Sequence, residues 1–277
     1  MRQRQTLAGE LFFSGVGLHS GKATQVRLFP RKRSGIYFYT PSGEGRLCEA
    51  QVAETSRLTA LRFRDGSEVR TVEHLLAALY ALEVDDAEIH LDGEEIPILD
   101  GSAHLFAEAI QSCGLVRNEE MLKEEYLMLP VSIVAGNKSI VAVPSHEFRV
   151  SYMIDYPGTP IGLQSITLPI TSGSFMERLS RARTFGLERE VGVLRGMGLA
   201  LGGSLDNALI FNDTALLNES GLRFPDECIA HKAVDLLGDL ARLERRVIAH
   251  YIVICGGHDL HAALVDRMRT LFGTIGL

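Results

Sequence analysis

The sequence has little of what marks secreted, membrane-embedded or disulfide-stapled proteins. It has only four cysteines in 277 residues, and none of them stands in a Cys-x-x-Cys spacing. A chain of this length does not need disulfides for stability, so we expect reduced thiols. The first residues lack the apolar run of about 7–15 residues found in signal peptides. No segment has the roughly 18 apolar residues of a membrane span. We therefore expect a cytoplasmic protein with no integral membrane segment.

Basic residues are outnumbered as well. Lys and Arg total 28 against 35 Asp and Glu, which gives a formal net charge of −7. A protein whose main partner is nucleic acid normally carries a strongly basic surface, so the composition argues against this class. Hydrophobic residues make up 46% of the chain and charged residues 23%, values that are ordinary for a globular protein with a core.

Common catalytic signatures are absent too. No stretch reads His-Glu-x-x-His, so the usual metalloprotease helix is not predicted. Gly-x-Ser-x-Gly is missing, which removes the simplest serine-esterase interpretation. The stretch Gly202-Gly203-Ser204 is not followed by Lys and Ser or Thr, so a phosphate-binding P-loop is not predicted.

The chain divides into two halves with the same order of predicted elements, namely strands, a helix, a strand and a helix. In the first half, the hydrophobic period predicts strands at 23–29, 36–39, 58–64 and 88–91, with helices at 71–82 and 103–113. In the second half it predicts strands at 127–134, 139–143, 148–155, 165–168 and 247–255, with helices at 225–243 and 258–271. Such an order favours two α+β domains of similar design.

A charged segment at 117–125 separates the halves, so we place the domains at 1–120 and 121–277. Residues 185–203 break the parallel between the halves. They combine a short amphipathic helix at 187–194 with a glycine-rich return. We interpret this segment as an insertion, and long insertions often carry function.

The long helix at 225–243 presents a polar stripe. His231 and Asp235 stand four residues apart and project within about 40° of each other, and Asp239 continues the stripe. Imidazole nitrogen and carboxylate oxygen both bind zinc. Taken alone, this spacing is more typical of a solvated helix face or a surface ion pair.

Glu73 and His74 lie inside the apolar pattern of the helix at 71–82. Both side chains are costly to bury without partners. His74 gains one as a third ligand beside His231 and Asp235, and three protein ligands are typical of a catalytic zinc site. Glu73 projects about 100° away from His74, so it suits a general base for the attacking water. A satisfied core histidine with an exposed glutamate is the alternative.

Gly256-Gly257-His258 joins the strand at 247–255 to the last helix. Glycine lets the backbone approach a ligand closely. If Asp239 pairs with His258, the charged imidazolium is favoured, and His258 can donate a proton to a leaving amine. A solvated histidine at a helix start is the alternative here.

Together these residues resemble the bacterial UDP-3-O-acyl-N-acetylglucosamine deacetylases, the zinc enzymes of an early lipid A step. The matching motifs run in family order along nearly the whole chain. They are Gly15-Val16-Gly17-Leu18-His19-Ser20-Gly21, Thr71-Val72-Glu73-His74-Leu75, Glu95-Ile96-Pro97-Ile98-Leu99-Asp100-Gly101-Ser102, Arg181-Ala182-Arg183-Thr184-Phe185-Gly186, Gly202-Gly203-Ser204, Gly221-Leu222-Arg223-Phe224, His231-Lys232 with Asp235 and Gly238-Asp239-Leu240, and Gly256-Gly257-His258.

The resemblance implies that each half is a β-sheet with helices on one face and that the two helical layers pack together. It implies one catalytic Zn²⁺ on His74, His231 and Asp235, with Fe²⁺ left open as the native metal. It assigns Glu73 as the base and His258, oriented by Asp239, as the acid. It also implies an oxyanion contact from Thr184 and a substrate contact from Lys232. An acyl-chain passage would be formed by the insertion, through Phe185, Leu187, Val191, Leu194 and Leu199.

The expected substrate is therefore a UDP-linked acylated amino sugar, handled by a monomer. Three departures from the family pattern stand near the site. Cys255 replaces a basic residue expected to contact phosphate, and His261 replaces an expected asparagine. The stretch Leu58-Thr59-Ala60-Leu61 lacks the cysteine that some members carry near the metal. A zinc deacetylase for another N-acetylated substrate and a non-catalytic ligand-binding relative are the alternatives.

Overall fold

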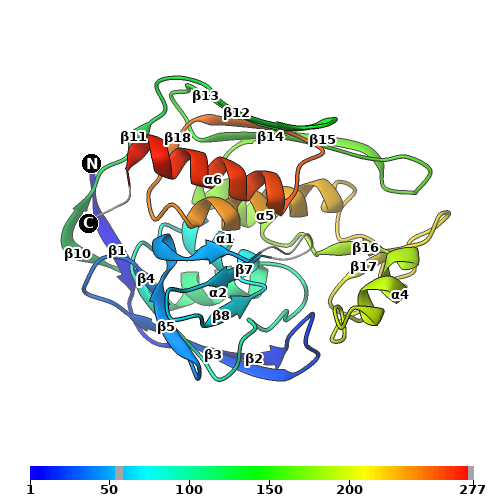
Figure 1. Ribbon diagram of the computed structural model, residues 1–277, viewed down its shortest axis with the longest axis horizontal. Helices are drawn as coiled ribbons and strands as arrows, with labels where there is room; N and C mark the ends of the chain where they lie inside the picture. Colours follow the sequence, from blue (N-terminus) through cyan, green and yellow to red (C-terminus); the bar gives the residue numbers. More distant parts are fainter. Residues whose placement is uncertain (54–58, 274–277) are drawn as a thin grey trace.

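The structure, a computed structural model, describes residues 1–53 and 59–273. Two five-stranded sheets form the outer layers, and the helices between them form the inner layers (Figure 1). Helices α1 (Glu73–Ala81) and α2 (His104–Cys113) belong to the first half. Helices α5 (Glu227–Ala241) and α6 (His258–Phe272) belong to the second. The α+β fold with helices on one face of each sheet is thus confirmed.

The first sheet has the order β2-β3-β9-β4-β5 and the second has the order β12-β13-β19-β14-β15. The strands of the first are β2 (Leu11–Val16), β3 (Ala23–Pro30), β4 (Ile36–Thr40), β5 (Gly43–Arg46) and β9 (Ala87–Leu91). Those of the second are β12 (Val131–Ala135), β13 (Lys138–Val143), β14 (Arg149–Tyr156), β15 (Gly162–Pro169) and β19 (His250–Ile254).

The two sheets are topological copies. In each, the fifth strand along the chain lies between the second and the third, antiparallel to the former and parallel to the latter. Strands β3 and β14 alternate buried and more exposed residues, as expected when only one face of a sheet is covered. The predicted structural repeat therefore holds at the level of strand order. The exact division at residue 120 stays a prediction.

Each half also carries extra strands between its fourth sheet strand and its first long helix. In the second half these are β16 (Phe185–Leu187) and β17 (Leu209–Phe211), a parallel pair with α4 (Glu188–Gly196) between them. In the first half they are β6 (Gln51–Val52), β7 (Ala60–Arg62) and β8 (Glu68–Arg70), a small sheet. The insertion at 185–203 therefore does not break the parallel between the halves, because the first half has an insertion at the same place.

Two predicted segments differ from the structure for reasons of pairing. The strand expected at 247–255 is divided at Ala249, because β18 (Val247–Ile248) pairs with β11 (Glu125–Tyr126) while β19 joins the main sheet. The charged segment at 117–125 mostly forms β10 (Leu115–Leu122), which pairs with β1 (Arg2–Leu7). Of the strand expected at 58–64, Leu58 lies outside the described residues.

Two short helical segments lie between β15 and β16, namely α3 (Ser172–Ser174) and the π-helical turn η2 (Phe175–Leu179). A 3₁₀ turn, η1 (Leu47–Glu49), lies in the first half. No helix in the described ranges is long and apolar enough to cross a bilayer.

The helical layers meet where α1 crosses α5. A Cβ placed on Gly238 would collide with the backbone carbonyl of Glu73, so only glycine allows the two helices to approach this closely. The contact lies one residue from His74 and three residues from Asp235. The crossing distance of the two helices therefore sets the distance between functional groups on them.

We predict that Gly238→Ala forces α1 and α5 apart. Overpacking of this kind costs about 1–3 kcal/mol of unfolding free energy, which chemical denaturation measures. The matched control is Gly192→Ala, since Gly192 lies in exposed α4 with nothing within 4 Å of a Cβ. That change is expected to leave stability unchanged or raise it by up to about 1 kcal/mol. Equal stability of the two variants contradicts the close-crossing argument.

Candidate active site

Three residues from two helices converge between the helical layers. His74 comes from the first turn of α1, and His231 and Asp235 come from successive turns of α5. His231 Nε2 lies 3.3 Å from Asp235 Oδ1, and His74 Nε2 lies 3.9 Å from the same oxygen. All three side chains are buried. The structure thus brings together the residues predicted as metal ligands.

The arrangement fits a metal ion by its own geometry. Ligand atoms at about 2.0–2.1 Å from a tetrahedral ion lie about 3.3 Å apart, close to the separations seen here. His231 Nδ1 donates to the carbonyl of Ala182 at 3.0 Å, which leaves Nε2 with its lone pair directed at the cluster. Burial lowers the pKa of His74 to about 3, so its imidazole is neutral as a ligand requires.

Glu73 precedes His74 on α1 and lines the same cavity. Its side chain is buried, and its Oε2 atom has no hydrogen-bond partner among the described residues. A buried carboxylate oxygen left unpaired is costly. Burial raises the pKa of Glu73 to about 7. A carboxylate with this pKa, open toward a cavity, is suited to accept a proton from water.

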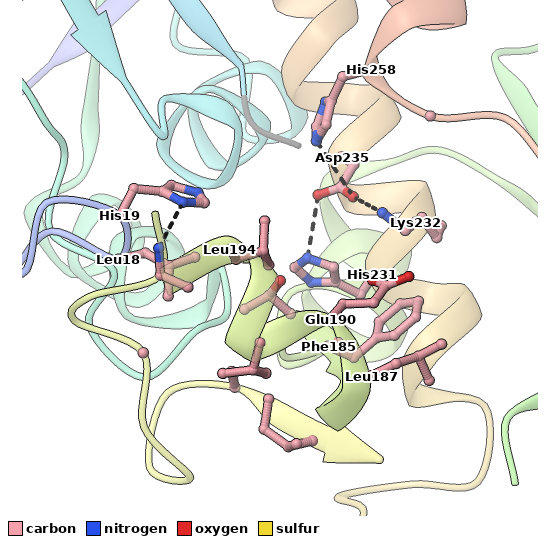
Figure 2. Close-up of a pocket in the computed structure, with 18 of the residues that line it drawn as sticks. Leu18, His19, Phe185, Leu187, Glu190, Leu194, His231, Lys232, Asp235 and His258 are labelled. Atoms are coloured by element: carbon pink, nitrogen blue, oxygen red, sulfur yellow. Dashed lines mark hydrogen bonds and ion pairs between the residues drawn. The ribbon is translucent and has the colours of Figure 1, made fainter. Parts of the chain in front are cut away.

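His258 opens helix α6 and points toward Asp235 of the cluster (Figure 2). Its Nδ1 donates to Asp239 Oδ2 at 2.7 Å, as the sequence predicts, and its Nε2 lies 4.0 Å from Asp235 Oδ2. Burial lowers its pKa, but the Asp239 carboxylate outweighs this effect and raises the pKa of His258 to about 9. The imidazolium is therefore the resting form and can serve as a proton donor.

Lys232 binds the second oxygen of Asp235. Its Nζ donates to Asp235 Oδ2 at 2.7 Å and lies 5.5 Å from the ring centroid of Phe185. Burial lowers the pKa of Lys232, yet the Asp235 carboxylate raises it above its ordinary value overall. The ammonium thus leaves Asp235 Oδ1 free to face the two histidines and places a positive charge on the cavity wall.

These groups line a cavity of about 730 Å³. Leu194 of α4 lies across the cavity from Asp235 of α5 (Figure 2). Among the residues predicted for the acyl passage, Phe185, Leu187, Val191 and Leu194 line this cavity. Leu199 does not. It packs against Ala53 and Ala60, because the chain turns back toward the first half after α4. Its expected place on the passage wall is therefore not supported.

Thr184 is held at the cavity by the chain on both sides. Its backbone N–H donates to Gly101, and its carbonyl accepts from Leu209. Its neighbour Arg183 forms a buried ion pair with Glu227 at the start of α5, with Nε 2.7 Å from Oε1. The segment is thereby fixed against α5, which carries His231. Thr184 lines the cavity with the other predicted residues.

Two further residues belong to the site although sequence reasoning gave them no role. Thr59 donates from Oγ1 to Asp239 Oδ1 at 2.7 Å. His19 lines the cavity, and its Nδ1 accepts from the backbone N–H of Ala200 at 3.4 Å. The motif around His19 was a usable signal. The stretch that contains Thr59 stood out only for lacking a cysteine, so the tertiary contact with Asp239 identifies its role.

A model of the UDP-3-O-acyl N-acetylglycosamine deacetylase family matches residues 4–270. The chain belongs to this deacetylase family. Relatives named UDP-3-O-acyl-N-acetylglucosamine deacetylase match over almost the whole chain. The protein of Nitratidesulfovibrio vulgaris is 43% identical over 260 residues, which cover 92% of this chain and 84% of the relative. That of Myxococcus xanthus is 42% identical over 272 residues, covering 96% and 86%. The family predicted from the motifs is thereby confirmed.

We predict that His231→Ala abolishes tight metal binding, because the remaining two ligands cannot hold the ion alone. Metal content per chain, measured after dialysis, is expected to fall from about one to near zero for a three-ligand site. His250→Ala is the control, since His250 lies on β19 and bonds Ser151 away from the cluster. A His231→Ala protein that still binds one ion tightly contradicts the ligand set.

Proposed function

We propose that the protein hydrolyses the N-acetyl group of UDP-3-O-acyl-N-acetylglucosamine, releasing acetate and the free amine, in an early step of lipid A biosynthesis. The chain's membership of the deacetylase family over residues 4–270 carries this proposal. The site supports it, since an unpaired buried carboxylate and a histidine that is charged at rest lie on one cavity. This pair matches the base and the acid that amide hydrolysis needs.

We propose that His74, His231 and Asp235 hold one Zn²⁺, with Fe²⁺ as the alternative native metal. Two imidazole nitrogens and one carboxylate oxygen suit either ion, so the donor set alone does not choose between them. A divalent ion bound there would supply Lewis acidity for the amide carbonyl and for water. We also propose that the protein acts in the cytoplasm as a monomer, since all these groups come from one chain.

The residues of the chain account for the proton movements. Glu73 Oε2 takes a proton from the water that attacks the acetamide carbon. The Thr184 hydroxyl donates to the oxyanion that forms, a contact worth about 3–4 kcal/mol when well aligned. His258 then gives its Nε2 proton to the sugar nitrogen as the C–N bond breaks, and Asp239 holds the imidazole through Nδ1. Lys232 contacts the polar part of the substrate beside the metal ligands.

The apolar wall formed by Phe185, Leu187 and Val191 would receive the acyl chain. Leu187 belongs to β16 and is 5% exposed, so it is fixed in the wall, whereas Val191 lies on α4 and is half-buried. Each methylene group moved from water to such a wall contributes about 0.8 kcal/mol. The acyl chain is therefore a binding handle that keeps the amide at the base.

We predict that Glu73→Gln lowers kcat by at least about 100-fold, the usual contribution of a general base. The amide keeps the shape of the carboxylate but cannot accept the proton. Acetate release from the UDP-sugar measures the effect, with chelator and zinc add-back on the wild type. Metal content is expected to stay at the wild-type level, since Glu73 is no ligand. A Glu73→Gln protein with near-normal kcat removes this residue from the role of base.

We predict that Val191→Asp raises KM for a long-chain substrate by about tenfold. Losing contact with two methylene groups costs about 1.6 kcal/mol, and about 1.4 kcal/mol is a factor of ten. A substrate with a short acyl group is expected to show little change. Val193→Asp is the control, because Val193 is 64% exposed and lies two residues away on the outer side of α4. An equal rise in KM for both substrates contradicts the proposed passage.

A further inference from the structure

Asp239 accepts hydrogen bonds from three buried or part-buried groups. Thr59 Oγ1 donates to Oδ1, and His258 Nδ1 donates to Oδ2 at 2.7 Å. His261 Nδ1 lies 2.8 Å from that same Oδ2. Two imidazoles from one face of α6 thus share one carboxylate oxygen. Only one of them, His258, reaches the cavity.

The second nitrogen of His261 is bonded as well. Its Nε2 lies 3.1 Å from the hydroxyl of Tyr152, which comes from strand β14, the neighbour of the central strand β19. His261 is 0% exposed and Tyr152 is 1% exposed, so water does not compete for either group. A chain of hydrogen bonds therefore runs from the sheet through α6 and α5 to His258.

The chemistry fixes the direction of every bond in this chain. The ionised carboxylate of Asp239 only accepts, so His261 must donate from Nδ1. The Tyr152 hydroxyl carries a proton, and its only hydrogen-bond partner in the described part of the chain is His261 Nε2. The phenol therefore donates to Nε2, and His261 is neutral with its proton on Nδ1. Burial lowers the pKa of His261, in agreement with this form.

The loop before His258 closes over this bond. A Cβ on Gly256 would lie 3.4 Å from the Tyr152 hydroxyl and 3.7 Å from His261 Nε2. The backbone that leads into His258 thus packs directly on the Tyr152–His261 pair. The pair therefore touches two groups that fix His258. His261 bonds the Asp239 carboxylate, and the turn at Gly256 packs on both members of the pair.

We propose that Tyr152 and His261 are positioning residues for His258. His261 holds the Asp239 carboxylate in the plane that His258 needs, and Tyr152 holds His261 in the tautomer that donates to Asp239. This inference rests on the proposed function, because it assumes that His258 is the acid. Neither residue lines the cavity, so the effect falls on kcat and not on substrate binding.

The physical reason is rotational freedom. Thr59, His258 and His261 hold the Asp239 carboxylate with three donors, one on Oδ1 and two on Oδ2. Without His261, Oδ2 keeps only the donor from His258 itself, so the His258–Asp239 pair can tilt as a unit. Residues that orient an active-site group in this way typically affect activity by about 10–100-fold when removed.

The first test reads the tautomer directly in the wild-type, metal-loaded protein. NMR of ¹⁵N-histidine-labelled protein is expected to show His261 with a protonated Nδ1 and an unprotonated, hydrogen-bonded Nε2. The His261→Asn spectrum assigns the signals. A His261 imidazole that is doubly protonated, or protonated on Nε2 alone, overturns the proposal. This result does not depend on activity, so it stands apart from any failure of the deacetylase assignment.

The second test uses two amides that differ in which contact they keep. In His261→Asn the amide nitrogen is bonded to Cγ, like Nδ1, and can still donate to Asp239. In His261→Gln the amide lies one bond further out, like Nε2, and reaches only toward Tyr152. We expect His261→Gln to lower kcat about tenfold at unchanged KM. His261→Asn is expected to keep kcat within about threefold, since its donor to Asp239 survives.

The control is His250→Gln on β19. His250 Nε2 bonds Ser151, the neighbour of Tyr152 on β14, but it takes no part in the hydrogen bonds that lead to His258. The substitution is expected to change neither kcat nor KM. Equal losses in His261→Asn and His261→Gln, or full kcat in His261→Gln, overturn the proposal. Thermal unfolding of both variants separates a folding defect from a positioning defect. If the wild-type protein releases no acetate, the proposed function is contradicted. The NMR test of the His261 tautomer still decides whether Tyr152 and His261 form the proposed hydrogen bonds.

Discussion

The close crossing of α1 and α5 at Gly238 is the constraint on which the rest of the site depends. It places the backbone of Glu73 against α5. His74 then reaches the pair formed by His231 and Asp235, with 3.9 Å between His74 Nε2 and Asp235 Oδ1. A wider crossing would separate ligands that no local sequence feature could bring back together. The close backbone contact at Gly238 therefore sets the spacing between the two halves at the cluster, and the residues proposed as metal ligands lie on both sides of it.

Burying so many ionisable groups around this helix crossing is tolerable because Asp235 and Asp239 both have compensating partners. Burial tends to raise the pKa of Asp235, but the Lys232 ammonium and the adjacent imidazole hold it well below its ordinary value. Asp239 is held low in the same way by His258 and by the hydrogen bond from His261. Glu73 is the exception, with an unpaired oxygen and a raised pKa. Of these three carboxylates, the one with an unpaired oxygen is the one proposed to take a proton.

The sequence predicted the elements well, and it named the three residues that the structure brings into one cluster, because both depend on local period and residue type. The stripe of His231, Asp235 and Asp239 follows directly from helical spacing. It could not predict pairing between distant strands, so the division at Ala249 and the partnership of β10 with β1 were missed. Thr59 was missed because a lone threonine has no signature until α5 and α6 lie beside it. Leu199 was assigned to the cavity wall because it is apolar. Residue type alone could not show that the chain turns there toward Ala53 and Ala60.

The two halves share one topology, yet they contribute different groups to the site. Helices α1 and α5 hold the same place in the two copies, between the inserted strands and the fifth sheet strand. Each copy uses its insertion differently. The first supplies Thr59 to the buried side of His258, and the second supplies β16 and α4 to the cavity wall. A site at the interface of two such copies can receive orientation from one insertion and substrate contacts from the other. Since the inserted strands lie outside both five-stranded sheets, these roles can change in sequence without disturbing the helix crossing that holds the ligands.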